Sequence, residues 1–107
     1  MLLDCDTFYT TNILDIIRQT NESVVLFSKQ YNENPIYSYI ELDRNDNIIN
    51  IKEKEKISNN ANTGCYVFND INQLLEGCKY ILNNNITFKG ETYTSCVIDY
   101  LIQNTAF

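Results

Sequence analysis

The earliest residues able to do chemistry are two carboxylates near the start of the chain, Asp4 and Asp6, separated by Cys5. They follow the apolar run 1–3, which we expect to be the end of a buried strand that runs into a loop. Open α/β sheets bind ligands at the carboxyl ends of their strands, and Mg²⁺ needs one or two carboxylates plus ligand phosphates. The spacing therefore suggests a magnesium site. A pair of acids that caps a turn or helix is an equally good interpretation.

A second candidate is the Glu53-Lys54 pair, directly after a predicted β-hairpin over 37–52. A carboxylate can accept hydrogen bonds from sugar hydroxyls, and an ammonium neutralises a phosphate as a point charge. The alternative is a solvated run of charges over 52–56, and for this pair taken alone that alternative is the better one.

Two glycine-containing segments complete the set of candidates. Thr63 and Gly64 lie in a predicted strand over 62–68. The glycine would let the backbone approach a sugar ring. The alternative interpretation is a bulge or tight packing against a helix. Glu91 lies in segment 90–95, which could face a cleft where it leads into a helix. In isolation, segment 90–95 fits a turn with capping residues better.

The elements that must position these residues follow from hydrophobic spacing and turn signals. Around the initial strand and the hairpin with its turn at 43–47, we expect these further elements: a helix over about 12–20, a strand at 24–27 buried on both faces, a loop at 53–61, the strand at 62–68, a helix capped by Asp70, a short extended piece at 86–88 and a helix from 94 or 95. The order β-α-β-β-β-β-α-α predicts one mixed α/β layered domain over 1–107.

Composition narrows the classes of function. The 107 residues carry a net charge of −6 with no cluster of Lys or Arg, which argues against binding a nucleic-acid backbone. Histidine is absent, and no two of the four cysteines form a Cys-x-x-Cys pair, so a zinc ribbon or a His-based triad is not expected. No apolar stretch reaches the ~20 residues of a membrane span, and no export signal is visible. We therefore expect a cytoplasmic protein with reduced thiols.

Taken in order, these segments resemble the sugar-phosphate nucleotidyltransferase family and its relatives in capsule and surface-polysaccharide gene clusters. The shared features are an apolar strand that ends in acids, a Pro-x-Tyr strand pair, a Glu-Lys step, an Asn-x-Gly-x-Tyr-x-Phe strand and a Gly-Glu-x-Tyr segment. In this sequence they are residues 1–6, 35–40, 53–54, 62–68 and 90–95. The resemblance implies a partial Rossmann-like, GT-A-like α/β fold: a mixed sheet with flanking helices.

The resemblance also implies an activity and roles for residues. A sugar 1-phosphate attacks the α-phosphate of a nucleoside triphosphate, which gives a nucleotide sugar and pyrophosphate. By analogy, Mg²⁺ is held by Asp4 and Asp6, and the catalytic residues are Asp6 and Lys54. The implied substrate-binding residues are Glu53 for sugar hydroxyls, Lys54 for the sugar phosphate, Thr63 and Gly64 for the sugar ring, and Glu91.

The sequence departs from the family in several places. The family's Gly-rich triphosphate loop precedes the acid pair, and this sequence begins at the pair, so we expect the C-terminal part of such a domain or a shortened relative. A family glycine is replaced by Ser38, and Ser95 and Cys96 replace a second metal-binding Asp, for which Asp99 is an uncertain substitute. Whether the chain is an enzyme therefore stays open. The alternatives are a non-catalytic assembly or regulatory domain and a GT-A-type glycosyltransferase fragment. An incomplete sheet would expose an edge and favour a homo-oligomer.

Overall fold

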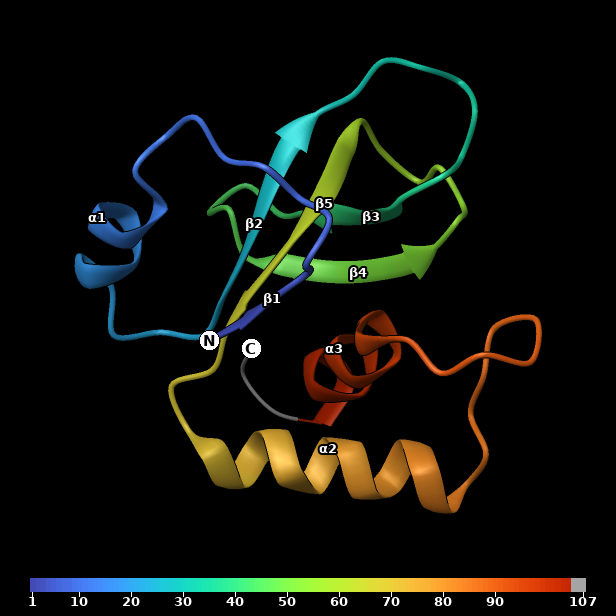
Figure 1. The fold of residues 1–107 in the computed structure, drawn as a ribbon. Coiled ribbons are helices and arrows are strands. Elements are labelled where there is room, and N and C mark those ends of the chain that lie inside the picture. The colour runs from blue at the N-terminus through green and yellow to red at the C-terminus, as the bar shows by residue number, and fades with distance from the viewer. Residues whose placement is uncertain (105–107) are drawn as a thin grey trace.

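The computed structural model describes residues 1–104 and contains the predicted order of elements. A bent sheet is flanked by helices, which confirms the mixed α/β class (Figure 1). The elements are β1 (Leu2–Leu3), α1 (Ile13–Arg18), β2 (Val24–Lys29), β3 (Ser38–Leu42), β4 (Ile48–Glu53), β5 (Asn60–Val67), α2 (Ile71–Asn83) and α3 (Thr94–Asn104).

Strand β5 organises the sheet. One of its edges pairs with β2 along most of its length, while its other edge pairs with β1 near Cys65 and with β3 at Ala61. Strand β4 then pairs with β3, and all of the described strand pairs run antiparallel. As a result, the N-terminal segment and the β3–β4 hairpin both reach the middle of the same strand.

The predicted hairpin is confirmed, and its turn is held by one carboxylate. Asp43 Oδ1 accepts hydrogen bonds from the backbone N–H groups of Asn45 (2.8 Å) and Asn47 (3.0 Å). The N–H of Asp43 itself donates to the carbonyl of Asn47 at 2.9 Å. Asp46 takes a left-handed backbone (φ 61°), a conformation that short polar residues tolerate. The hairpin delivers the Glu53-Lys54 step to a defined place at the end of β4.

Helix α3 lies between the sheet and α2 (Figure 1). Ile98 on α3 packs against the sheet in one buried cluster, whose other members are the sheet residues Val25, Ile40, Ile51 and Tyr66. A second cluster fills the space between the helices and contains Ile81, Val97 and Leu101. Gly77 lets the two helices approach, because a Cβ at that position would lie 2.9 Å from Val97 Cγ1. The packing of α3 fixes the start of that helix, at Thr94 and Ser95, relative to the sheet.

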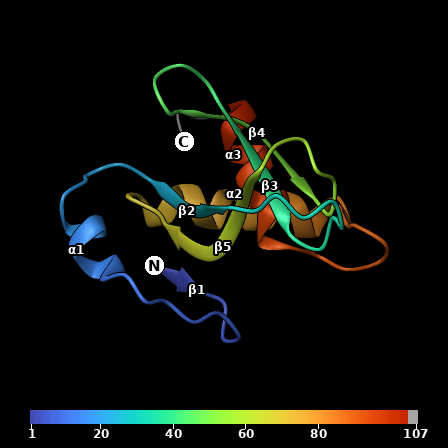
Figure 2. The same cartoon turned by 90° about the horizontal axis from the view of Figure 1, so that it is seen from above.

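The N-terminal part of the chain is less buried than its sequence predicts. Leu2 and Leu3 are 42% and 50% exposed, so the expectation of a buried first strand is wrong. The expectation that segment 24–27 is buried on both faces is also wrong, since only Val25 is buried there. The reason is topological: β1 and β2 pair only with β5 among the described strands, and α1 lies on the side of the molecule away from α3 (Figure 2).

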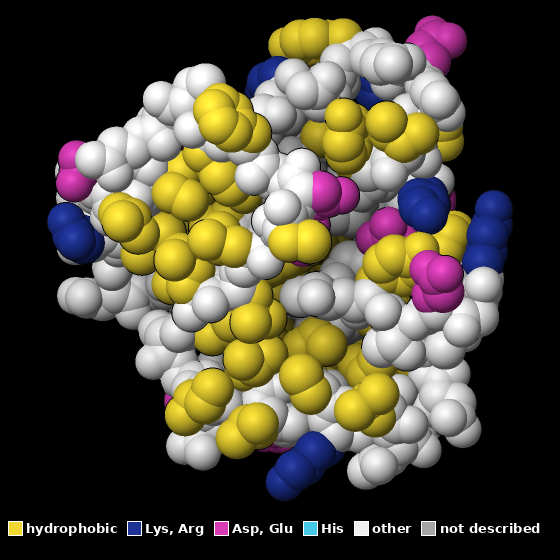
Figure 3. All heavy atoms as spheres, viewed as in Figure 1, with side chains coloured by type: hydrophobic (Ala, Val, Ile, Leu, Met, Phe, Trp, Pro, Cys, Tyr) yellow, Lys and Arg dark blue, Asp and Glu magenta, His cyan; other side chains and the backbone are white. Residues whose placement is uncertain are grey.

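Exposed apolar side chains gather over α1 and α2 on the face shown in Figure 3. They include Leu14 and Ile16 of α1 and Ile71, Leu75 and Leu82 of α2. Exposed apolar surface of this kind favours association, so a homo-oligomer stays our prediction. Light scattering at increasing protein concentration would test it, and a constant monomer mass would contradict it.

Two further sequence-based expectations can be compared with the described residues. All four cysteines are free in the structure, while their reduced state in a cytoplasm stays a prediction. Within residues 1–104, no helix has both the length and the apolar character that a bilayer crossing requires.

Candidate functional site

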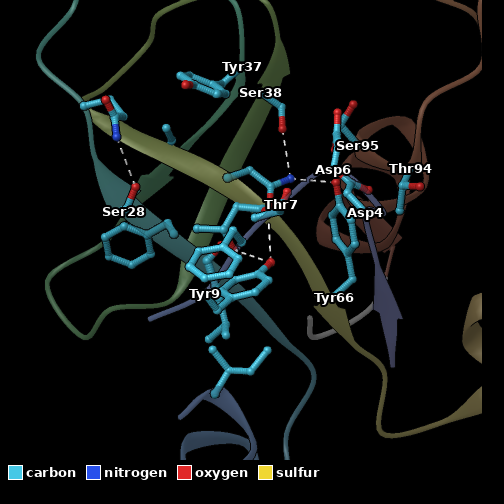
Figure 4. Close-up of a pocket in the computed structure, with 18 of the residues that line it drawn as sticks. Asp4, Asp6, Thr7, Tyr9, Ser28, Tyr37, Ser38, Tyr66, Thr94 and Ser95 are labelled. Carbon is cyan, nitrogen blue, oxygen red and sulfur yellow. Dashed lines mark hydrogen bonds between the residues drawn. The ribbon is translucent and has the colours of Figure 1, made fainter. Parts of the chain in front are cut away.

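A cavity of about 840 Å³ lies where the N-terminal segment meets the sheet and the start of α3. It is lined by residues from six stretches of the chain that are separate in sequence: 4–16, 26–30, 36–38, 53–54, 61–66 and 93–95. Figure 4 shows side chains from these stretches around the cavity, among them Asp4, Asp6, Tyr9, Ser38 and Ser95. The β3–β4 hairpin, β5 and the segment after β1 therefore all contribute to one cavity.

Both acids of the N-terminal pair line this cavity. The backbone N–H of Asp4 donates to the carbonyl of Gly64 at 2.9 Å, which extends the pairing of β1 with β5 by one residue. The pKa of the Asp4 carboxyl is raised, first by partial burial and then by the charge of Asp6. Because the charge of Asp6 disfavours the ionised form of Asp4, a cation placed beside Asp4 would be stabilising.

The donor set fits Mg²⁺ in the way that nucleotide sites use it. Within residues 1–104, no three side chains of the types His, Cys, Asp and Glu form a metal-binding cluster. A cation at Asp4 and Asp6 would therefore complete its shell with water and ligand oxygens, and an open cavity provides room for both. Mg²⁺ is commonly bound by one or two carboxylates plus substrate phosphates.

Gly64 lies at a bulge in β5. The register of β2 against β5 jumps between Leu26, which faces Cys65, and Phe27, which faces Asn62, so Thr63 and Gly64 are additional residues in β5. Gly64 has a left-handed backbone (φ 82°), and a Cβ on it would overlap the carboxylate of Asp4. The bulge, one of the alternatives weighed from the sequence, is present. The group that approaches Gly64 is Asp4 of the same chain.

Thr63, displaced by the bulge, lines the cavity. Its hydroxyl donates to the carbonyl of Leu26 at 2.9 Å, and the hydroxyl of Tyr9 donates to the Thr63 carbonyl, also at 2.9 Å. The bond from Tyr9 connects the N-terminal segment to β5, and the bond to Leu26 connects β5 to β2.

Asn62 is a central residue of the site, which the sequence analysis included in the strand motif 62–68 without giving it a role. It is buried, and its Nδ2 donates to the hydroxyls of Ser38 (2.9 Å) and Tyr66 (2.8 Å). Its Oδ1 accepts the backbone N–H of Gly64 at 2.8 Å. Burial raises the pKa of Tyr66 to about 12, against the opposing effect of the bond from Asn62. Asn62 therefore joins β3 to the bulge of β5. No local signal in the sequence separates this buried asparagine from one in a loop, so the sequence could not identify it.

Glu53 lies at the end of β4 and faces the start of α3. The hydroxyl of Ser95, which is buried, donates to Glu53 Oε2 at 2.7 Å. Both residues line the cavity. This single hydrogen bond holds one carboxylate oxygen in place, and the other remains available to accept from a ligand.

Lys54 follows with a left-handed backbone (φ 52°), and its N–H donates to the carbonyl of Tyr37 at 2.8 Å. Its ammonium donates to the hydroxyl of Tyr93 at 3.2 Å, and this bond is the main reason that the pKa of Lys54 is raised. The hydroxyl of Tyr93 in turn donates to Glu91 Oε2 at 2.7 Å. The sequence missed Tyr93 as a partner of Lys54 because 39 positions separate the two residues.

The candidates from the sequence are thus mostly brought together. Asp4, Asp6, Glu53, Lys54 and Thr63 line one cavity. Two candidates, Gly64 and Glu91, are not in its lining. Gly64 is in close contact with the Asp4 side chain. Glu91 is exposed and accepts a hydrogen bond from Tyr93, which lines the cavity. Asp99 accepts a hydrogen bond from Gln103 along α3 and is also outside the lining.

The charge of the lining limits what can bind. Among the described residues that line the cavity, three are acidic (Asp4, Asp6 and Glu53) and one, Lys54, is basic. A phosphate ligand would be repelled by this excess of negative charge unless a cation accompanied it. Hydroxyl groups, in contrast, find several acceptors.

The structure is thus a mixed α/β fold with an acid pair and a Glu-Lys step around one cavity, and a glycine bulge lies beside the acid pair. The sequence model of the nucleotidyl transferase family matches residues 1–85, which is most of the chain. The chain therefore belongs to the nucleotidyl transferase family, whose fold is Rossmann-like. A comparison with curated proteins gave no match.

Proposed function

We propose that the chain is the sugar-phosphate-binding part of a sugar 1-phosphate nucleotidyltransferase. The observation that supports this proposal best is the shared cavity: Asp4, Asp6, Glu53, Lys54 and Thr63 come from separate parts of the chain and line the same space. Membership of the nucleotidyl transferase family supports the same class of reaction.

Each residue has a role in the proposal that its surroundings support. Glu53, fixed by Ser95, accepts hydrogen bonds from sugar hydroxyls. Lys54 neutralises the sugar phosphate, and Thr63 with the adjacent bulge borders the sugar ring. Asp4 and Asp6 are the proposed Mg²⁺ ligands.

The proposed reaction is attack by an oxygen of the sugar phosphate on the α-phosphorus of a nucleoside triphosphate, with pyrophosphate as the leaving group. When bound, Mg²⁺ would supply charge neutralisation at the phosphates. The protein's own residues position the nucleophile: Glu53 orients the sugar, and Lys54 lowers the charge repulsion that opposes approach of two anions. Phosphoryl-type transfer needs little covalent help from the protein, which suits a chain without histidine.

The test is calorimetric titration of the full chain with a panel of sugar 1-phosphates, with and without Mg²⁺. We expect saturable binding that needs Mg²⁺ and is weakened about tenfold or more in Lys54→Ala, because a charge-assisted contact is lost. Lys79→Ala is the matched control, since Lys79 is exposed on α2 outside the cavity. Absence of binding, or equal affinity in Lys54→Ala, would overturn the proposal.

A second measurement separates the proposal from a glycosyltransferase. Release of pyrophosphate from a nucleoside triphosphate and the bound sugar 1-phosphate is expected of a nucleotidyltransferase and not of a glycosyltransferase. Binding without release of pyrophosphate would favour the alternative interpretation as a non-catalytic assembly or regulatory domain.

A further inference from the structure

The contact between Lys54 and Tyr93 suggests a role for a residue that the proposed function leaves unassigned. We propose that Tyr93 is a positioning residue that holds the ammonium of Lys54 at the cavity for the phosphate of a sugar 1-phosphate. The inference rests on the proposed function of Lys54. It is supported by a hydrogen bond of 3.2 Å between Lys54 Nζ and the Tyr93 hydroxyl, and by the position of both residues on the cavity lining.

The Tyr93 hydroxyl is oriented for this role by Glu91. A tyrosine hydroxyl has one proton, and here it is donated to Glu91 Oε2 at 2.7 Å. The oxygen therefore presents a lone pair, rather than a proton, to the ammonium of Lys54. A hydroxyl committed in this way accepts from a cation better than a freely rotating one. Glu91 thus acts on Lys54 through Tyr93, which gives a function to the exposed Glu91.

The ring of Tyr93 packs against Phe88, which lies in a short turn. Phe88 and Glu91 exchange two backbone hydrogen bonds of 2.8 Å and 3.0 Å, and the Phe88 ring meets the Tyr93 ring edge-on with 6.3 Å between centroids. The ammonium of Lys54 lies 5.3 Å from the Tyr93 ring centroid, within the range of cation–π attraction. The Phe88 ring and the turn therefore support the Tyr93 ring beside the Lys54 ammonium.

Lys54 needs such support because its side chain is flexible. Its backbone is fixed by the bond to Tyr37, but four rotatable bonds separate that backbone from the ammonium. Ordering a lysine side chain costs conformational entropy. Tyr93 uses one of the three ammonium donors and leaves two for a phosphate.

The experiment compares Tyr93→Phe, which keeps the ring and removes the hydroxyl, with the wild-type chain. The probe is α-D-glucose 1-phosphate with Mg²⁺, titrated by calorimetry. We expect Tyr93→Phe to weaken affinity about three- to tenfold, the usual effect of one lost hydrogen bond. Tyr100→Phe is the matched control, because the Tyr100 hydroxyl donates to Glu76 at 3.1 Å on the outer side of α2 and α3. Tyr100→Phe should leave affinity unchanged.

A second readout follows the Lys54 ammonium directly. NMR titration of the lysine side-chain signals, assigned with Lys54→Arg, should give a lower pKa for Lys54 in Tyr93→Phe, since the Tyr93 hydroxyl is the main group that raises it. A purely structural role for Tyr93 would leave that pKa unchanged, and this result would overturn the inference.

The outcomes distinguish the two proposals. If Lys54→Ala weakens binding while Tyr93→Phe binds like the wild type, the positioning role is wrong and the proposed function stands. If Tyr100→Phe weakens binding as much as Tyr93→Phe, the positioning role is also wrong. If Lys54→Ala has no effect, the proposed function fails, and the inference fails with it.

Discussion

The carboxylate of Asp4 occupies the space that a side chain at position 64 would need. Gly64 takes a left-handed conformation (φ 82°), its carbonyl accepts the N–H of Asp4 at 2.9 Å, and a Cβ built on it would lie 2.7 Å from the Asp4 Cβ, closer than real side chains approach. The glycine thus fixes where the first acid of the pair can lie. One position of β5 couples the fold of the sheet to the candidate metal site.

We predict that Gly64→Ala destabilises the protein for two additive reasons. A left-handed backbone costs an alanine about 1–2 kcal/mol, and the overlap with Asp4 should add about 1–3 kcal/mol. Gly90→Ala is the matched control, because Gly90 has nearly the same φ (83°) but has nothing within 4 Å of the added Cβ. Urea denaturation should show the larger loss for Gly64→Ala. Equal losses would mean that Asp4 moves away freely.

The hairpin turn should depend on pH through Asp43. Hydrogen bonds from the backbone N–H groups of Asn47 and Asn45 lower the pKa of Asp43 below its ordinary value of 3.8. The carboxylate therefore stabilises the folded state above pH 3.8, and this contribution is lost as the pH falls through the lower folded-state pKa. Asp43→Ala should lower the melting temperature at pH 7, and its difference from the wild type should shrink below pH 4.

Asp46→Asn provides the comparison for this turn, because an asparagine also tolerates the left-handed backbone at position 46. It should melt like the wild type at both pH values. If the deficit of Asp43→Ala is the same at pH 3 and pH 7, the backbone hydrogen bonds do not favour the ionised carboxylate.

The sequence predicted the elements whose signals are local. Periodicity and capping located α2 after Asp70, whose side chain accepts from the N–H of Asn72, and alternation with a polar turn located the β3–β4 hairpin. It failed where burial depends on neighbours in space. Leu2 and Leu3 form an apolar run, yet β1 has one strand partner among the described residues, and its side chains stay exposed.

The candidate site divides in the same way. The sequence analysis selected its charged members, such as Asp6 and Lys54, because charged side chains at the ends of predicted strands can be recognised locally. Its supporting members were not, because Asn62, Tyr93 and Ser95 act through contacts between distant segments: Asn62 with Ser38, Tyr93 with Lys54, and Ser95 with Glu53. A buried asparagine or serine has no local signature that separates it from one in a loop.

Ser95→Ala should weaken both stability and binding. Its hydroxyl donates to Glu53 at 2.7 Å from a buried position, and a hydrogen bond to a charged group contributes about 1.5–3 kcal/mol. Without it, the Glu53 carboxylate loses a fixed orientation, so affinity for a sugar 1-phosphate should also fall. Thr94→Ala, at the adjacent cavity position, is the comparison in denaturation and calorimetry. Similar losses in both variants would show that the start of α3, rather than the bond to Glu53, carries the effect.

Asp6→Asn should remove Mg²⁺ binding while the fold survives, since Asp6 is an exposed residue of the cavity lining. Changes to groups that only support metal ligands cost about 10- to 100-fold in metal affinity, so loss of a ligand carboxylate should cost at least as much. Titration with Mn²⁺, read as paramagnetic broadening of amide signals, would measure the affinity and locate the ion. Asp99→Asn is the decisive control, because Asp99 is the other acid considered as a ligand and lies outside the cavity lining. Broadening that disappears in Asp99→Asn and persists in Asp6→Asn would move the metal site from the N-terminal acid pair to α3, and the proposed roles of Asp4 and Asp6 would be wrong.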